Sequence, residues 1–337
     1  MSFRVITLLF YLFCALNAAA DTNTTTQTFS QYIDEKHKNF SKYIVELFKS
    51  VDQSISEWVD TPDVNTTSEN GTKDSIDKFF KDEKFIQETE ESYLLIRLGS
   101  NYQSKESTDF KYRIRAQIPL SKSKKNFQLF VNDIEKNYFD DTAYTKQESE
   151  KNTYVGVNYF APLYKDIKSK YSVGIRSLSL YARARYSKDY TAGKWLIQPS
   201  QEFKYSTKYD WSEETELYID RILTENSLFR TRLHRKTQAH IEGFDYSVAF
   251  SYYLTLSKRK GFNFTQQFWG NSKYVCDAAP EPFNGISNYS SFISWRQNIY
   301  RKWISYEIRP GISFHREYDY EPNYIFSLYF DFYFGNI

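Results

Sequence analysis

The sequence predicts an all-β fold: an antiparallel up-and-down transmembrane β-barrel of about 14 strands after a short α-helical N-terminal segment. Three observations predict it. From residue 91 onward, apolar and polar side chains alternate with a period of two almost to the end of the chain. Aromatic residues make up 19% of the chain, although hydrophobic residues total only 41%. Beyond the first 20 residues, no apolar run is long enough for a membrane-spanning helix, so a crossing would need strands.

The first 20 residues have the organisation of a secretory signal peptide. Arg4 supplies a positive start, residues 5–16 are largely apolar, and Ala18–Ala20 offer a small-residue cleavage site. We therefore expect the mature chain to begin near Asp21. Cys276 is then the one mature cysteine, which predicts no intrachain disulfide.

Residues 21–90 are predicted to be a periplasmic helical segment and linker. Between Phe29 and Trp58 the apolar residues recur at helical spacing, which indicates a long amphipathic helix. A linker follows over residues 60–73, which are rich in Asn, Thr and Asp and contain Pro62 and Gly71. A second, short helix is expected over residues 75–90. The chain thus divides into 1–20, 21–90 and a barrel over 91–337.

The barrel strands are expected where the alternation is continuous. They are 92–103, 107–118, 126–134, 153–161, 169–177, 179–187, 194–206, 211–222, 227–237, 245–257, 261–270, 289–300, 303–314 and 323–334. With both termini at one end of an even-stranded barrel, the long connections 135–152 and 271–288 fall at the opposite end, as external loops do. The apolar phase shifts within 169–187; a bulge there, instead of a turn, would favour 12 strands.

A large soluble β domain would also alternate, and the position of the aromatic residues favours the membrane barrel. Many lie near predicted strand ends, as in the aromatic girdles of membrane barrels. The examples are Tyr154, Trp195, Trp211, Trp269, Tyr289 and Trp303.

The charged face of each strand is expected to line the interior, because Arg or Lys on the lipid face costs about 2–4 kcal/mol at the bilayer midplane. The acidic residues gather on the strands within 194–222, and most of the cations lie on flanking strands. The predicted interior charges are Arg113, Arg115, Arg176, Arg183, Arg185, Glu202, Glu214, Glu216, Asp220, Arg230, Arg232, Glu307, Arg309 and Asp331.

Two hypotheses for the interior stay open. Opposed charged walls would suit a water-filled pore that passes small polar solutes, with anions favoured by the excess of cations. Alternatively, Arg and Glu pair across neighbouring strands and fill the lumen, which would leave a non-conducting structural or interaction barrel. Fourteen strands lie between the filled eight-stranded barrel and the open 16-stranded porin, and the helix over 29–58 could enter the lumen.

Other activities have weaker support. The formal net charge of +2 gives no reason to expect nucleic-acid binding. No cysteine cluster indicates a metal, and no cofactor is expected. Ser313 and His315 share one face near an external loop, so an outer-membrane hydrolase is a third, less favoured hypothesis. The polar external loops could meet a surface protein, and the helical segment a periplasmic one.

The last predicted strand resembles the C-terminal signal of outer-membrane proteins. Phe334 ends an alternating series with Phe332, Phe330, Leu328 and Phe326. More broadly, the chain resembles uncharacterised proteobacterial outer-membrane proteins with a helical N-terminal segment, in its residues 58–60, 79–80, 182–186 and 306–310. The resemblance implies a bacterial outer-membrane location with the N-terminal segment in the periplasm. It also implies outer-membrane lipid and the barrel-assembly machinery as partners.

Overall fold

The computed structural model describes residues 29–56, 76, 79–80, 93–106, 108–119, 126–134, 152–176, 178–240, 242–276, 279–283, 286–299 and 303–335. The predicted signal peptide, the linker over 60–73 and most of the predicted helix over 75–90 lie outside these residues. Of that last helix, Ile76, Phe79 and Phe80 are described, and all three are helical.

The predicted long amphipathic helix is confirmed as α2 (Phe29–Ser56), which ends two residues before the expected limit. It contains neither Gly nor Pro, so nothing interrupts its backbone hydrogen bonds over 28 residues. Phe40 and Tyr43 are exposed on it. No helix in the described part of the chain is both long and apolar enough to cross a membrane.

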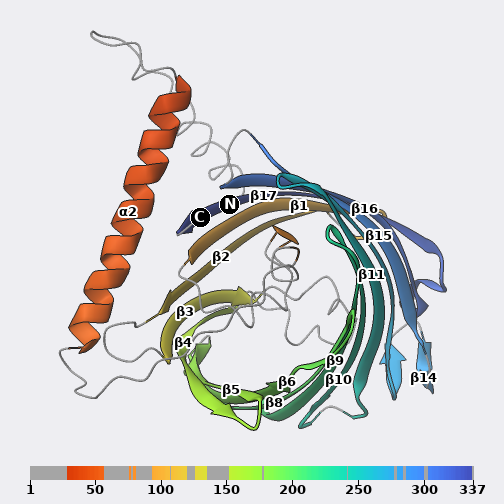
Figure 1. The fold of residues 1–337 in the computed structure, drawn as a ribbon. Coiled ribbons are helices and arrows are strands. Elements are labelled where there is room, and N and C mark those ends of the chain that lie inside the picture. Colours follow the sequence, from red (N-terminus) through yellow and green to blue (C-terminus); the bar gives the residue numbers. More distant parts are fainter. Residues whose placement is uncertain are drawn as a thin grey trace. The chain divides into compact units, whose positions relative to one another are not determined.

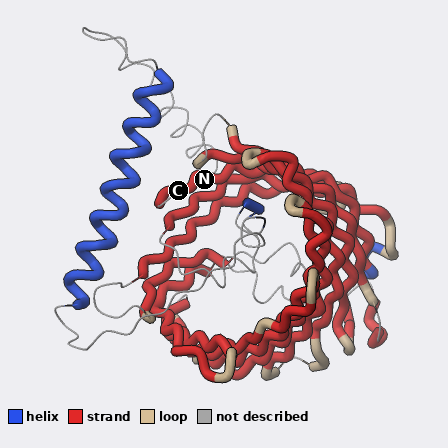
Figure 2. The backbone as a smooth tube through the Cα atoms, viewed as in Figure 1, coloured by secondary structure: helices blue, strands red, loops and turns tan. Residues whose placement is uncertain are grey.

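The remainder of the described chain is dominated by one closed antiparallel sheet (Figures 1 and 2). Its strands are β1 (Tyr93–Gln103), β2 (Asp109–Pro119), β3 (Phe127–Ile134), β4 (Asn152–Tyr164), β5 (Ile167–Arg176), β6 (Ser179–Lys188), β7 (Tyr190–Ala192), β8 (Trp195–Ser206), β9 (Asp210–Thr224), β10 (Ser227–Gln238), β11 (Asp245–Ser257), β12 (Lys260–Asn271), β15 (Asn288–Asn298), β16 (Ile304–His315) and β17 (Pro322–Gly335). Each strand pairs with its neighbours in the chain, and β1 closes the ring against β17.

The wall of the barrel has 14 strands, as predicted. The sheet contains 15 hydrogen-bonded segments. However, β6 and β7 both pair with β8 in one register, so together they count as a single strand of the barrel wall. The break in pairing falls between Ser187↔Ser200 and Tyr190↔Ile197, and Pro199, which has no backbone N–H to donate, lies within it. The phase shift within 169–187 is a turn: Arg176 of β5 pairs with Ser179 of β6. Leu178 between them has a φ of +69°, and the 12-stranded alternative is therefore wrong.

The two long connections lie at the same end of the barrel. Antiparallel pairing places the start of β1 and the end of β17 at one end, which we call the terminal end. The β3–β4 and β12–β15 connections leave from the opposite end, the loop end, together with the short 3₁₀ helix η2 (Arg316–Tyr318) between β16 and β17. The second connection contains a small hairpin of its own, β13 (Tyr274–Cys276) and β14 (Ala279–Phe283).

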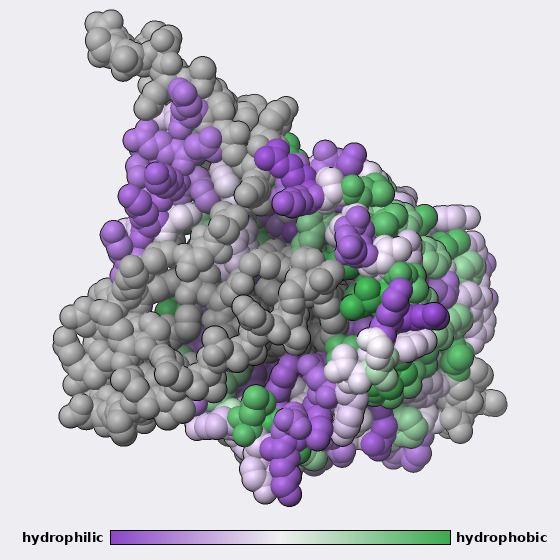
Figure 3. Space-filling view, viewed as in Figure 1, coloured by the Kyte–Doolittle hydropathy of each residue, from purple (hydrophilic) through white to green (hydrophobic). Residues whose placement is uncertain are grey.

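The two faces of the wall have opposite polarity. Large apolar side chains are exposed on the outside: Val173, Ile175 and Leu180 are each more than half exposed. Figure 3 shows such hydrophobic side chains gathered on the outer surface of the strands. Side chains at the alternate positions, such as Ser172 and Arg176, are buried. The charged and polar faces of the strands thus point inward, which is the reverse of a water-soluble β domain.

Strands β4 and β5 approach each other closely at Gly156 and Gly174, which are directly paired. A Cβ added at Gly174 would lie 2.4 Å from the Val155 carbonyl oxygen and 3.0 Å from the Tyr181 hydroxyl. Tyr181 forms an inward aromatic cluster with Phe130 and Tyr154. Only glycine fits this position, because the nearest atom belongs to the backbone.

We expect Gly174→Val to destabilise the folded barrel by about 1–3 kcal/mol through overpacking. The measurement is the denaturant midpoint of the heat-modifiable folded form in detergent. Val173→Ala, on the exposed outer face of the same strand, is the matched control and should leave that midpoint nearly unchanged. Equal midpoints for the two variants would contradict this account of the β4–β5 contact.

Candidate functional site: the inner wall of the barrel

All fourteen predicted interior charges occupy inward positions of their strands. Each alternates along its strand with residues of the outer face. Buried among them are Arg113, Arg115, Arg176, Glu216, Asp220, Arg230, Arg232, Glu307 and Asp331, and half-buried are Arg183, Arg185, Glu202, Glu214 and Arg309. The placement of these residues could be read from the sequence, whereas their partners could not.

One charged cluster, the β16–β17 cluster, joins Arg97, Arg296, Arg309, Glu307 and Asp331. Asp331 accepts two hydrogen bonds from Arg97, at 2.6 Å from Nε and 2.8 Å from Nη2. Arg296 Nη2 lies 2.6 Å from the second oxygen of the same carboxylate. Glu307 lies 3.4 Å from Arg97 and 3.3 Å from Arg296. Arg309 Nε lies 3.6 Å from Glu307, so two buried carboxylates contact three arginines from three different strands.

A second cluster, the β6–β10 cluster, lies on another part of the ring. Glu216 accepts from Arg185 at 3.0 Å and from Arg232 Nη2 at 2.5 Å. Asp220 forms a bidentate pair with Arg230 at 2.8 and 2.9 Å. Weaker or more exposed pairs extend this cluster: Arg183 and Arg185 each lie 3.8 Å from Glu202, and His234 Nε2 lies 2.8 Å from Glu214.

A ladder of uncharged side chains, ending at Arg183, crosses the strands between the two clusters. Each amide or hydroxyl bonds to a residue of the next strand at 2.6–3.3 Å. In order, the ladder runs through Tyr93, Gln117, Gln128, Asn158, Ser172 and Arg183. The inner wall is thus tied together by side chains from β1 to β10, in addition to the backbone ladder.

These contacts favour local pairing over two opposed charged walls. Glu202, Glu216 and Asp220 are paired with arginines of the adjacent β6 and β10, as the second hypothesis for the interior expected. The cations still outnumber the acids on the inner wall. Arg183 is 24% exposed, more than Arg185, Arg230 and Arg232, and so is the most accessible arginine of its cluster.

Sequence reasoning missed Arg97 and His234 as interior residues. Arg97 lies in the apolar stretch Tyr93–Leu98, where alternation is hidden because Leu94, Leu95 and Ile96 are all apolar. The register of β1 against β17 places Arg97 directly opposite Asp331. A single arginine within an apolar strand was the one signal available from the sequence.

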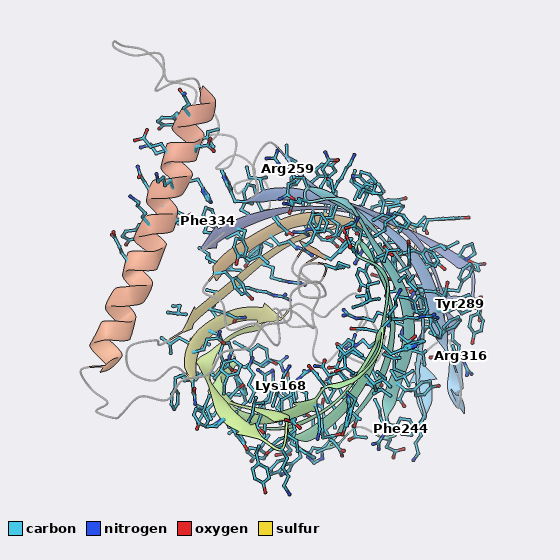
Figure 4. All side chains as sticks on the ribbon, in the orientation of Figure 1. Lys168, Phe244, Arg259, Tyr289, Arg316 and Phe334 are labelled. Atoms are coloured by element: carbon cyan, nitrogen blue, oxygen red, sulfur yellow. The ribbon has the colours of Figure 1, made fainter. Side chains whose placement is uncertain are left out.

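Two levels of aromatic residues mark the outer surface. Near the terminal end, Phe127, Tyr159, Tyr171 and Tyr186 contact one another in series across β3–β6. Near the loop end, Tyr289 stacks on Phe314 with ring centroids 4.8 Å apart. Figure 4 shows Tyr289 and Phe244 projecting from the outside of the wall. Such girdles are placed where a bilayer has its two interfaces.

The predicted girdle membership is wrong for Tyr154 and Trp269. Both are buried, at 5% and 4% exposed, on inward positions. Tyr154 packs on Tyr181 and lies under the Arg176 guanidinium, 4.9 Å from ring to cation. Position near a strand end does not determine the face of a side chain, because one residue of offset moves it to the other side. Trp195 and Trp211 are exposed on the outside, as predicted.

Ser313 and His315 do come together, with Oγ and Nε2 2.8 Å apart. The Asn288 amide nitrogen, in the orientation that satisfies its neighbours, lies 3.3 Å from His315 Nδ1. Nδ1 then accepts, so the proton of the neutral ring is on Nε2 and is donated to Ser313. A general base needs the opposite tautomer. Ser313, 1% exposed and also bonded by Asn323, is therefore arranged as a structural hydroxyl.

Side chains at the loop end connect the β1–β2 turn to the β16–β17 connection. Tyr318 donates to Glu106 at 3.1 Å, and Lys105 pairs with Glu321. Burial, together with the neighbouring Glu106 carboxylate, raises the pKa of Tyr318, so the phenol stays neutral and keeps its proton for this bond. The hydrogen bond and charge of Lys105 lower the pKa of the exposed Glu321. Among the described residues, no three His, Cys, Asp or Glu side chains gather as a metal site.

Comparison with known proteins gives likenesses in fold alone. No protein-family model and no curated protein matches the sequence. Among solved structures, the KdgM porin has a TM-score of 0.36 and 7% identity, covering 71% of this chain and 98% of its own. OccK10 (OpdN) of Pseudomonas aeruginosa has a TM-score of 0.43 and 6% identity, and the match covers 72% of this chain and 98% of OccK10. The NanC porin has a TM-score of 0.38 and 6% identity, and the match covers 70% of this chain and 98% of NanC. With TM-scores below 0.5, these likenesses carry no weight for function.

We expect Asp331→Asn to destabilise the barrel by about 3–5 kcal/mol, because Arg97 and Arg296 would be left buried without their shared carboxylate. Glu242→Gln removes a carboxylate of an exposed pair with Lys273 and should cost less than about 1 kcal/mol. Denaturant unfolding of both variants in detergent micelles measures the difference. Similar losses for the two would show that the β16–β17 cluster contributes little to stability.

Proposed function

We propose that the protein is an outer-membrane β-barrel that lets small polar or anionic solutes pass passively. The proposal rests on the polarity of the closed wall, which exposes large apolar side chains outside and buries paired charges inside. In water, so much exposed apolar surface would be unfavourable, whereas hydrocarbon solvates it. The two levels of aromatic residues on the outer surface also support a barrel that crosses a bilayer from one interface to the other.

The preference for anions rests on the composition of the inner wall. Arginines of the two charged clusters exceed the carboxylates that hold them, and Arg183 and Arg97 keep 24% and 14% of their side chains exposed. A low-dielectric wall with an excess of positive charge raises the local concentration of anions. The orientation we propose puts the terminal end, and so the N-terminal segment, in the periplasm.

Planar-bilayer conductance tests the pore directly. We expect stepwise current from purified, folded protein, and a reversal potential under a KCl gradient that indicates anion preference. Absence of stepwise current would favour the non-conducting barrel. That rival has one observation in its support, the dense side-chain network of the inner wall.

The variant Arg183→Glu should shift the reversal potential toward cation preference, because it replaces the most exposed arginine of the β6–β10 cluster with an anion. Arg221→Glu is the matched control. Arg221 is exposed on the outer face, 5.0 Å from the Trp195 ring, and changes the net charge equally without facing the lumen. A shift of the same size in both variants would show that selectivity comes from net charge and not from the inner wall.

A further inference from the structure

One part of the inner wall is apolar, in contrast to the charged clusters beside it. Leu228 of β10 and Tyr253 of β11 occupy inward positions close to the terminal end, with Ile222 of β9 next to them. Leu228 is 0% exposed and Tyr253 5% exposed. We call Ile222, Leu228 and Tyr253 the apolar ledge. Inside a lumen lined by arginine and glutamate, such a surface is unfavourable unless something covers it.

The described residues from ahead of the barrel cover this ledge. Ile76 belongs to the same buried cluster as Leu228 and Tyr253 and is 3% exposed. The Phe80 ring packs on Tyr253 with centroids 5.2 Å apart, and Phe79 packs on Phe80 at 5.1 Å in an edge-on arrangement. Figures 1 and 2 show this short helical piece within the ring of strands.

The wall is shaped to receive these rings. Gly261 occupies the inward position of β12 next to the ledge, paired with Thr255 of β11. A Cβ added at Gly261 would lie 2.7 Å from Phe79 Cε1 and 2.7 Å from Phe80 Cζ. Both rings therefore use the space that the missing side chain leaves, and a larger residue would push them away from the wall.

The ledge is also in contact with the charged wall. Tyr253 lies 5.6 Å from the Arg230 guanidinium, which also faces Tyr218 at 5.5 Å and pairs with Asp220. The position of the two phenylalanines is thus connected through one tyrosine to the β6–β10 cluster. A displacement of Phe80 would open Tyr253 and Arg230 to the lumen.

We propose that Ile76, Phe79 and Phe80 form an occluder that the chain carries in itself, seated on the apolar ledge and narrowing the lumen at the terminal end. The proposal rests on the proposed pore and adds its regulation: the pore widens when the occluder leaves the ledge. Apolar contact holds it there, so a change that weakens this contact shifts the population toward the wider state.

The test compares unitary conductance of the full-length protein with that of the triple variant Ile76→Ser, Phe79→Ser, Phe80→Ser. We expect roughly a twofold or larger increase, because a wider lumen conducts more. The double variant Phe40→Ser, Tyr43→Ser removes exposed aromatic groups from α2, away from the ledge, and should conduct as the unaltered protein does. Equal conductance of the triple variant and the unaltered protein would overturn the occluder and leave the pore intact.

A change on the wall side tests the same contact without altering the occluder. Gly261→Val should displace the rings and raise the conductance as the triple variant does. Thr265→Val places the same side chain on the same inward face of β12, away from the rings, and should not. If both valine variants fold, as shown by heat-modifiable mobility, and the conductance of neither one increases, the proposed contact of the rings with the wall at Gly261 would be wrong.

Chemical labelling gives a readout that does not depend on current. In a Cys276→Ser background, the thiol of Leu228→Cys should resist a water-soluble maleimide. It should become reactive when the three serine substitutions are introduced into the same chain. Protection that persists in that background would overturn the occluder. Reactivity gained without any stepwise current would support the occluder and count against the proposed pore, so the two failures can be told apart.

Discussion

The closed ladder of backbone hydrogen bonds is the constraint on which the rest of this structure depends. A strand that crosses hydrocarbon must satisfy every N–H and C=O, and joining β1 to β17 leaves no open edge in the ring. Closure divides each strand into an outward and an inward face, one residue apart. The apolar surface, the aromatic levels and the charged interior are consequences of that division.

The inward face then has to accommodate many charged side chains that are buried in the wall. Its solution is to share carboxylates: Asp331 serves Arg97 and Arg296, and Glu216 serves Arg185 and Arg232. Sharing satisfies the acids completely while leaving the wall with more cations than anions. The same arrangement therefore ties neighbouring strands together and gives the interior a positive bias, which is the property on which the proposed pore rests.

The apolar ledge is the place where the inner wall departs from this rule. Leu228 and Tyr253 face inward beside a paired arginine, and Ile76 and Phe80 cover them. A glycine at position 261 leaves room for the rings. Complementarity on both partners distinguishes this contact from an accidental collapse of an apolar stretch onto the nearest surface. The proposed occluder would place control of the lumen in Ile76, Phe79 and Phe80.

The sequence by itself indicated the fold, a wall of about 14 strands and the face of most charges, because a period of two is a local property; the turn at Leu178, which excludes 12 strands, was decided by the structure. The alternation of Phe326, Phe330 and Asp331 in β17 could be read without any structure. Tertiary structure decided which charges meet, since Arg97 and Asp331 are 234 residues apart and are joined only by closure of the ring. It also decided that Tyr154 and Trp269 face inward and that Ile76 and Phe80 lie on a wall formed by β9–β12. Such contacts depend on strand register and on the curvature of the wall, and no local pattern encodes either.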